Sequence, residues 1–158
     1  MMNYLPNKRF LNIIKYSKEM KKVLDVNIND YKKYLDWIEI EIIPKKKSFG
    51  RFININNNEK YYHIYFNDNK EEAKQFTIMK EVKIDKIKVI IDNEVKSLYK
   101  LFCGCEIIEK ISFINFYKDD IINMSHMFSR CSSLKKLNLS NFNTNNVTDM
   151  NSMFAVCS

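Results

Sequence analysis

Cysteine and histidine are the residue types that most readily bind metals or attack substrates, and this chain has four cysteines and two histidines. Cys103 and Cys105 flank a single glycine, whereas structural zinc sites usually separate paired cysteines by two to four residues. His63 and His126 lie far apart in the sequence. We therefore expect no metal site, no cofactor and no pair of nucleophile and base.

The glycines argue against a second kind of chemistry. Loops that bind phosphate need several glycines close together, so that the backbone can approach the phosphate group. Gly50 and Gly104 are the only glycines in the chain, and they are far apart. We predict that the protein is not an enzyme.

A step of 26 residues relates side chains of the same type along the last third of the chain. It joins three phenylalanines and three cysteines, which are Phe102, Phe128 and Phe154, and Cys105, Cys131 and Cys157. A free cysteine that is buried behaves as a small apolar residue. We therefore predict that these cysteines belong to a core, and that the chain contains tandem repeats whose units stack.

The pattern within one unit predicts a strand followed by a short helix. Leu137 and Leu139 alternate with polar residues, which is typical of a strand. In the segment 149–154, Met150, Met153 and Phe154 have a spacing that would place them on one face of a helix. A single unit cannot bury such a face alone, so stacked units would share a core.

We predict an α+β fold, in which a small N-terminal cap precedes a short leucine-rich-repeat-like solenoid. The cap would occupy residues 1–83 and the repeats residues 84–158. The repeat units would be 84–105, which is degenerate, then 106–131 and 132–157, which form an incomplete array. Within the cap, we predict helices at 10–26 and 30–37 and strands at 38–43, 51–55, 61–66 and 76–82, with a hairpin loop at 56–58.

One stretch of the repeats carries a specific motif. It comprises Leu137-Asn-Leu139-Ser140-x-Phe142 and Val147-Thr148-Asp149-Met150-x-x-Met153-Phe154. With this motif, residues 95–158 resemble the BspA-like leucine-rich repeat surface proteins. The resemblance implies an adhesion or host-contact role, a place on the cell surface and no catalytic residues. The chain itself starts without an export signal and has no apolar stretch as long as a membrane span, so its own sequence predicts a cytoplasmic location.

The net charge of +7 is unevenly distributed. Residues 101–158 hold five basic and five acidic side chains, so the whole excess lies in the first hundred residues. A basic region can attract nucleic acid or an anionic surface. Because the basic residues do not interleave with a nucleic-acid motif, we keep nucleic-acid or anionic-surface binding as the alternative function.

Our leading hypothesis is a module for protein–protein interaction or adhesion. If the repeats stack in register, Lys86, Lys110 and Lys136 take equivalent outward strand positions and would attract an acidic partner. Six exposed residues are the candidate contacts: Lys86, Lys110, Ser112, Lys136, Asn138 and Ser140. We also expect self-association through the open C-terminal repeat, where Met153 and Phe154 would be exposed.

Overall fold

The computed structural model describes residues 37–55, 58–116 and 118–157. They belong to one compact unit, Trp37–Ser158. The helix predicted at 10–26 lies outside the described residues, as does all but the last residue of the helix predicted at 30–37.

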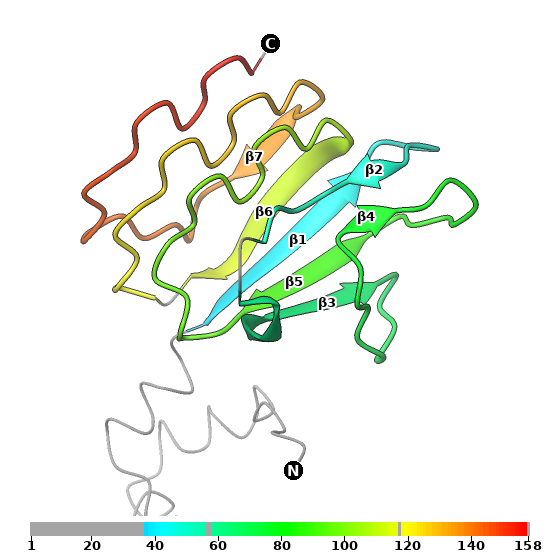
Figure 1. Ribbon diagram of the computed structural model, residues 1–158, viewed down its shortest axis with the longest axis horizontal. Coiled ribbons are helices and arrows are strands. Elements are labelled where there is room, and N and C mark those ends of the chain that lie inside the picture. The colour runs from blue at the N-terminus through cyan, green and yellow to red at the C-terminus, as the bar shows by residue number, and fades with distance from the viewer. Residues whose placement is uncertain (1–36, 56–57, 117, 158) are drawn as a thin grey trace, which may run out of the picture. The chain divides into compact units, whose positions relative to one another are not determined.

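A five-stranded sheet forms the centre of this unit (Figure 1). In spatial order its strands are β3 (Tyr62–Phe66), β5 (Ile87–Ile91), β1 (Ile38–Pro44), β6 (Ile108–Phe116) and β7 (Lys136–Asn138). Neighbouring strands are antiparallel except for β6 and β7, which are parallel. In β1 the isoleucines Ile38, Ile40 and Ile42 are fully buried. Glu39 and Glu41 alternate with them on the opposite face, so the strand predicted at 38–43 is confirmed.

The other predicted strands of the cap are paired differently from our expectation. β2 (Gly50–Arg51) pairs with β4 (Thr77–Ile78) in a separate two-stranded sheet, whereas β3 pairs with β5. The predicted hairpin around 56–58 is therefore wrong, because its two arms belong to different sheets. A single turn of 3-10 helix, η1 (Glu59–Tyr61), leads into β3.

The three repeat units run side by side, as the green, yellow and red coils of Figure 1 show. The same main-chain hydrogen bond recurs between successive units. The Phe102 amide donates to the Met127 carbonyl, and the Phe128 amide donates to the Met153 carbonyl, both at 2.9 Å. The rings of Phe102 and Phe128 stack at 5.8 Å, and both side chains are fully buried between the coils and the sheet.

The predicted fold class, an α+β cap followed by a leucine-rich-repeat solenoid, is wrong. The described residues form a mostly β fold and contain no α-helix. The segment 149–154, predicted as a helix, is a series of turns, because Ser152 has a left-handed backbone (φ 52°) that an α-helix cannot contain. The repeat strands β6 and β7 are part of the central sheet and do not form a separate solenoid. No helix in the described part of the chain is long and apolar enough to cross a membrane.

Candidate partner-binding face of the sheet

The parallel pairing of β6 with β7 brings two of the candidate lysines together. Lys110 lies opposite Lys136, Ile111 opposite Leu137, and Ser112 opposite Asn138. Successive residues of a strand point to opposite faces. Because Ile111 is fully buried in the core, Lys110 and Lys136 lie side by side on the outer, polar face of the sheet.

The charge of this lysine pair is only partly compensated. Lys110 Nζ lies 3.7 Å from Glu41 Oε1 of the neighbouring strand β1, with both side chains more than 30% exposed. Lys136 is exposed and forms no ion pair with any residue that the structure describes. Next to it along the chain, Lys135 Nζ pairs with Glu109 Oε1 at 3.2 Å. The excess positive charge of this face is therefore located at Lys136.

Lys86 does not join the column that we predicted. The segment containing Ile87 and Val89 matches the repeat pattern, but it forms β5, and β1 lies between β5 and β6. Lys86 Nζ instead pairs with Asp68 Oδ1 at 2.6 Å. The hydrogen bond to the Asp68 carboxylate raises the pKa of Lys86, so this lysine is charged but already has an anionic partner.

Three further candidate residues occupy different environments. Ser112, which we expected to be exposed, is only 3% exposed. It lies between Glu41 of β1 and Asn138 of β7. Asn138 and Ser140 are exposed, but the Asn138 side-chain oxygen accepts hydrogen bonds from the Ser140 amide at 3.0 Å and the Ser140 hydroxyl at 2.8 Å. These two residues form a turn at the end of β7, and the candidate contacts reduce to Lys110, Lys136 and this turn.

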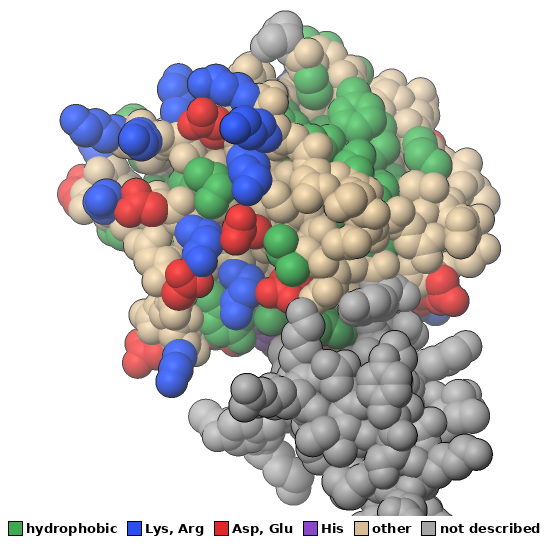
Figure 2. Space-filling view, turned by 180° about the vertical axis from the view of Figure 1, so that it is seen from behind, with side chains coloured by type: hydrophobic (Ala, Val, Ile, Leu, Met, Phe, Trp, Pro, Cys, Tyr) green, Lys and Arg blue, Asp and Glu red, His purple; other side chains and the backbone are tan. Residues whose placement is uncertain are grey.

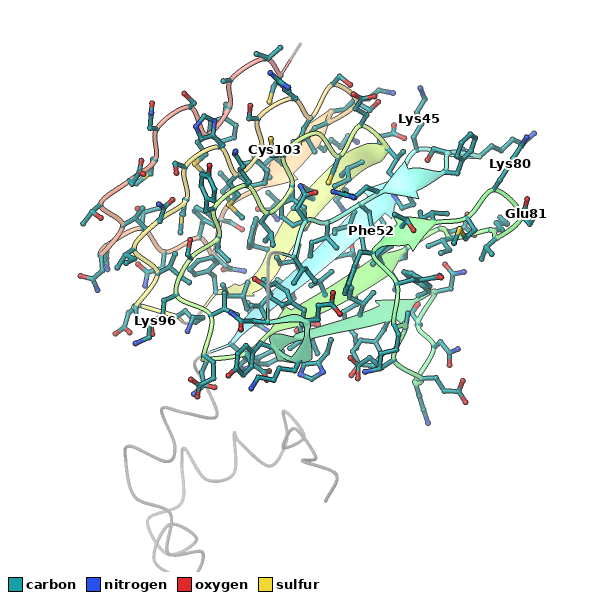
Figure 3. The ribbon with its side chains drawn as sticks, in the orientation of Figure 1. Lys45, Phe52, Lys80, Glu81, Lys96 and Cys103 are labelled. Carbon is teal, nitrogen blue, oxygen red and sulfur yellow. The ribbon has the colours of Figure 1, made fainter. Side chains whose placement is uncertain are left out.

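A hollow of about 380 Å³ lies beside the start of β7. Its lining includes Lys45, Glu109, Lys135, Ser132 and Ser133. Lys45 follows β1 and points outward near the end of the sheet in Figure 3. Leu134, Cys131 and Cys157 also line it, so the hollow is mixed in polarity and bordered by charges of both signs.

The cysteines take the core positions that the repeat spacing predicted, with one exception. Cys105 and Cys131 are buried, whereas Cys157 is exposed. Burial raises the pKa of the Cys105 thiol, and it raises that of Cys131 to about 12. Such thiols are protonated and unreactive near neutral pH. Among the described residues, no three His, Cys, Asp or Glu side chains are grouped so as to hold a metal ion.

Asn54 has a structural role that sequence reasoning missed. Its amide donates to the Leu101 carbonyl at 2.8 Å, and its side-chain amide donates to the carbonyls of Lys100 at 3.0 Å and Cys103 at 2.7 Å. In the next repeat, Met127 and Ser129 are equivalent to Leu101 and Cys103, and their carbonyls accept hydrogen bonds from the amides of Phe102 and Gly104 in the preceding unit. Asn54 thus occupies the place of a preceding unit. No local signal distinguishes it from the other asparagines of its Asn-rich segment.

Lys118 is a second residue that the sequence did not single out. Its side chain is fully buried, and Nζ donates to the Asn93 carbonyl at 2.7 Å and pairs with Asp120 Oδ1 at 2.8 Å. A buried lysine needs such partners, because an isolated buried charge is very costly. Lys118 therefore joins the segment after β5 to the segment after β6.

Charged side chains are unevenly distributed over the surface of the molecule. Figure 2 shows Lys, Arg, Asp and Glu side chains interleaved over one side of the visible face, and mostly uncharged side chains over the other. Exposed apolar residues of the repeats include Ile114, Ile122 and Phe154.

Residues 70–158 match a protein family described as "Mycoplasma protein of unknown function, DUF285". The matched region contains β4 to β7 and all three repeat coils. The chain belongs to this family. No curated protein and no solved structure matches the chain.

Proposed function

We propose that the protein is a non-enzymatic module that binds an acidic protein partner on the polar face of its sheet. The observation that carries the proposal is the side-by-side placement of Lys110 and Lys136 in the parallel pair β6–β7. Like charges at directly opposite positions destabilise a sheet. An anionic partner would remove that cost, because its carboxylates would lie between the two ammonium groups.

The surroundings of the pair support a protein partner. Glu41 partly neutralises Lys110, which limits the positive field to the β7 side of the face. The turn formed by Asn138 and Ser140 lies next to Lys136 and adds exposed polar groups that can take part in hydrogen bonds. A mixture of charge and neutral polar groups is typical of the rim of a protein interface.

We also propose that the family relationship extends to the BspA-like leucine-rich repeat surface proteins, which would make adhesion the role of this binding. The support is the spacing of Leu137, Leu139 and Phe142 together with the repeated Met-Phe pair. Self-association through the last repeat remains a prediction. Its apolar contact would be Phe154, which is 50% exposed, rather than Met153, which is buried.

Charge reversal of the two lysines tests the binding proposal. Lys110→Glu combined with Lys136→Glu should abolish binding of the full chain to an immobilised polyglutamate peptide, because attraction becomes repulsion. Binding can be measured by surface plasmon resonance at low and at physiological salt. Circular dichroism of the double variant checks that the sheet is retained.

A matched control changes the net charge equally, but on loops distant from β7. Lys70→Glu combined with Lys80→Glu alters two exposed lysines and should leave polyglutamate binding within about twofold of the wild type, because only long-range screened charge differs. Unchanged binding of the Lys110/Lys136 variant, or equal losses in both double variants, would refute a specific acidic-partner site.

The alternative function is binding to nucleic acid or to an anionic surface through the basic first hundred residues. The structure adds one observation in its favour, since Lys45, Lys46 and Lys47 are all exposed in the turn after β1. Neutralising phosphates releases condensed counterions, so binding of a DNA oligonucleotide should fall steeply between about 50 and 200 mM salt. A DNA affinity that exceeds the polyglutamate affinity and depends on Lys45–Lys47 would favour this alternative.

A further inference from the structure

A short loop segment covers the outer edge of the sheet. β3 is the outermost strand on that side, and Ala73, in the loop between β3 and β4, forms an antiparallel bridge with Ile64 of β3. The Ala73 amide donates to the Ile64 carbonyl at 2.7 Å. Exposed edge strands readily pair with other chains, so a segment lying on the edge protects it.

His63 of β3 contacts both the covering loop and the strand on its other side. Its Nδ1 lies 3.4 Å from Oε1 of Glu72, which belongs to the covering loop. Its Nε2 lies 3.3 Å from each carboxylate oxygen of Asp92, which follows β5. All three side chains are between 27% and 30% exposed, so solvent weakens these interactions without removing them.

The protonation state of the imidazole decides whether both contacts are attractive. A neutral imidazole has one N–H and one lone pair, so one ring nitrogen would direct its lone pair at an ionised carboxylate. The imidazolium ion has two N–H groups and can donate to Glu72 and to Asp92 at once. The geometry points to His63 as a proton-operated clamp that holds the covering loop on the edge of β3.

The other charged groups around the clamp do not replace it. Lys74 Nζ pairs with the same Glu72 oxygen at 3.3 Å, but Lys74 is 82% exposed and lies in the same loop. On β3, burial and then the charges of Glu72 and Asp92 raise the pKa of Tyr65. Lys88 Nζ of β5 lies over the Tyr65 ring at 4.6 Å. Of these groups, only the imidazole contacts both the covering loop and the residue that follows β5.

The clamp weakens as the pH rises. As the pH rises through the range in which imidazole loses its proton, one ring nitrogen becomes an acceptor and the Glu72 contact or the Asp92 contact turns repulsive. The covering loop then loosens and the edge of β3 becomes accessible to another strand.

Hydrogen exchange of the Ala73 amide measures how firmly the covering loop is held on β3. For the full chain, we expect the protection factor of this amide to be roughly threefold to tenfold higher at about pH 5.5 than at about pH 8, after correction for the intrinsic exchange rate. A change of this size is what two partly solvent-exposed ion pairs would produce. In the variant His63→Gln the protection should be the same at the two pH values. Equal protection of the wild-type amide at both would overturn the proposal.

Two further variants make the test specific. The chain has one other histidine, so His126→Gln is the matched control, and it should keep the wild-type pH dependence. Glu72→Gln removes the loop's carboxylate and keeps the imidazole, so it should flatten the pH dependence even if His63→Gln fails to fold. A pH dependence that persists in Glu72→Gln, or that disappears in His126→Gln, would refute the assignment to His63.

Discussion

The thiols of the repeat column donate to main-chain carbonyl groups of the neighbouring unit. Cys131 Sγ donates to the Phe102 carbonyl at 3.0 Å, and Cys157 Sγ donates to the Phe128 carbonyl at 2.8 Å. The same two carbonyls also accept the Cys105 amide at 3.0 Å and the Cys131 amide at 3.2 Å, so each thiol is a second, weak donor to an oxygen that has two lone pairs. The repeated cysteine is therefore explained by packing and local hydrogen bonding and does not require a chemical role.

This assignment predicts a large difference in thiol reactivity. Because burial raises the pKa of Cys131 to about 12, almost none of it is thiolate near neutral pH. At about pH 8, alkylation of Cys131 by iodoacetamide should be on the order of a thousandfold slower than that of an unperturbed cysteine. Cys157 is exposed and should react readily. Peptide mass spectrometry measures both rates.

Unfolding the protein in urea provides the control for this experiment. All four cysteines should then be alkylated at similar rates, since the difference arises only from the fold. Rapid labelling of Cys131 in the native protein would contradict its place in the core.

At the scale of the element, each repeat coil is shaped by residues with a left-handed backbone. The positive φ angles recur with the 26-residue period, at Lys100, His126 and Ser152 (57°, 56° and 52°), and at Gly104, Arg130 and Val156 (69°, 60° and 59°). Glycine adopts this conformation without strain, whereas other residues pay a steric cost. The coils therefore tolerate strain at five of six such positions and use glycine once.

Replacing one of the strained residues by glycine should stabilise the protein. Arg130→Gly should raise the free energy of unfolding by up to about 1 kcal/mol, because relief of the left-handed strain exceeds the added entropy of the unfolded chain. Urea denaturation measures the change.

Arg130→Ala is the matched control, because alanine removes the same side chain but retains a Cβ atom. It should give no comparable gain. A destabilising effect of Arg130→Gly relative to Arg130→Ala would show that the backbone at this position is not strained.

At the scale of the whole molecule, a single core joins the repeat coils to the central sheet. Phe128 stacks on Phe102 at 5.8 Å and on Phe154 at 5.4 Å, and it meets the edge of Phe113 of β6 at 6.4 Å. On the cap side, Phe52 is also fully buried and lies over the middle of the sheet in Figure 3. The aromatic column of the repeats and the cap thus pack against the same layer of strands.

The centre and the end of this aromatic column should differ in their contribution to stability. Phe128→Ala should cost about 3–5 kcal/mol, because the side chain is fully buried and leaves a cavity. Phe154→Ala should cost less than half as much, because Phe154 is 50% exposed. Urea denaturation of both variants tests the difference, and equal costs would contradict the position of Phe128 at the centre.

The sequence alone determined the features that depend on local periodicity. The alternation from Ile38 to Ile43 identified a strand and its buried face, and the 26-residue step placed Lys110 beside Lys136. Both features follow from periodicity in the sequence. A period of two assigns the residues of a strand to its two faces, and a fixed repeat length aligns neighbouring units.

Only the tertiary structure decided which strands pair with each other and which segments form turns instead of a helix. The segment 84–89 has the spacing of a repeat strand, yet it pairs with β1 because hydrogen bonding between distant strands is not encoded in local alternation. The same limit explains the error at 149–154, where apolar spacing favoured a helix and the left-handed Ser152 produced turns. The buried position of Ser112 between β1 and β7, and the contacts of His63, likewise arise from strands that lie far apart in the sequence.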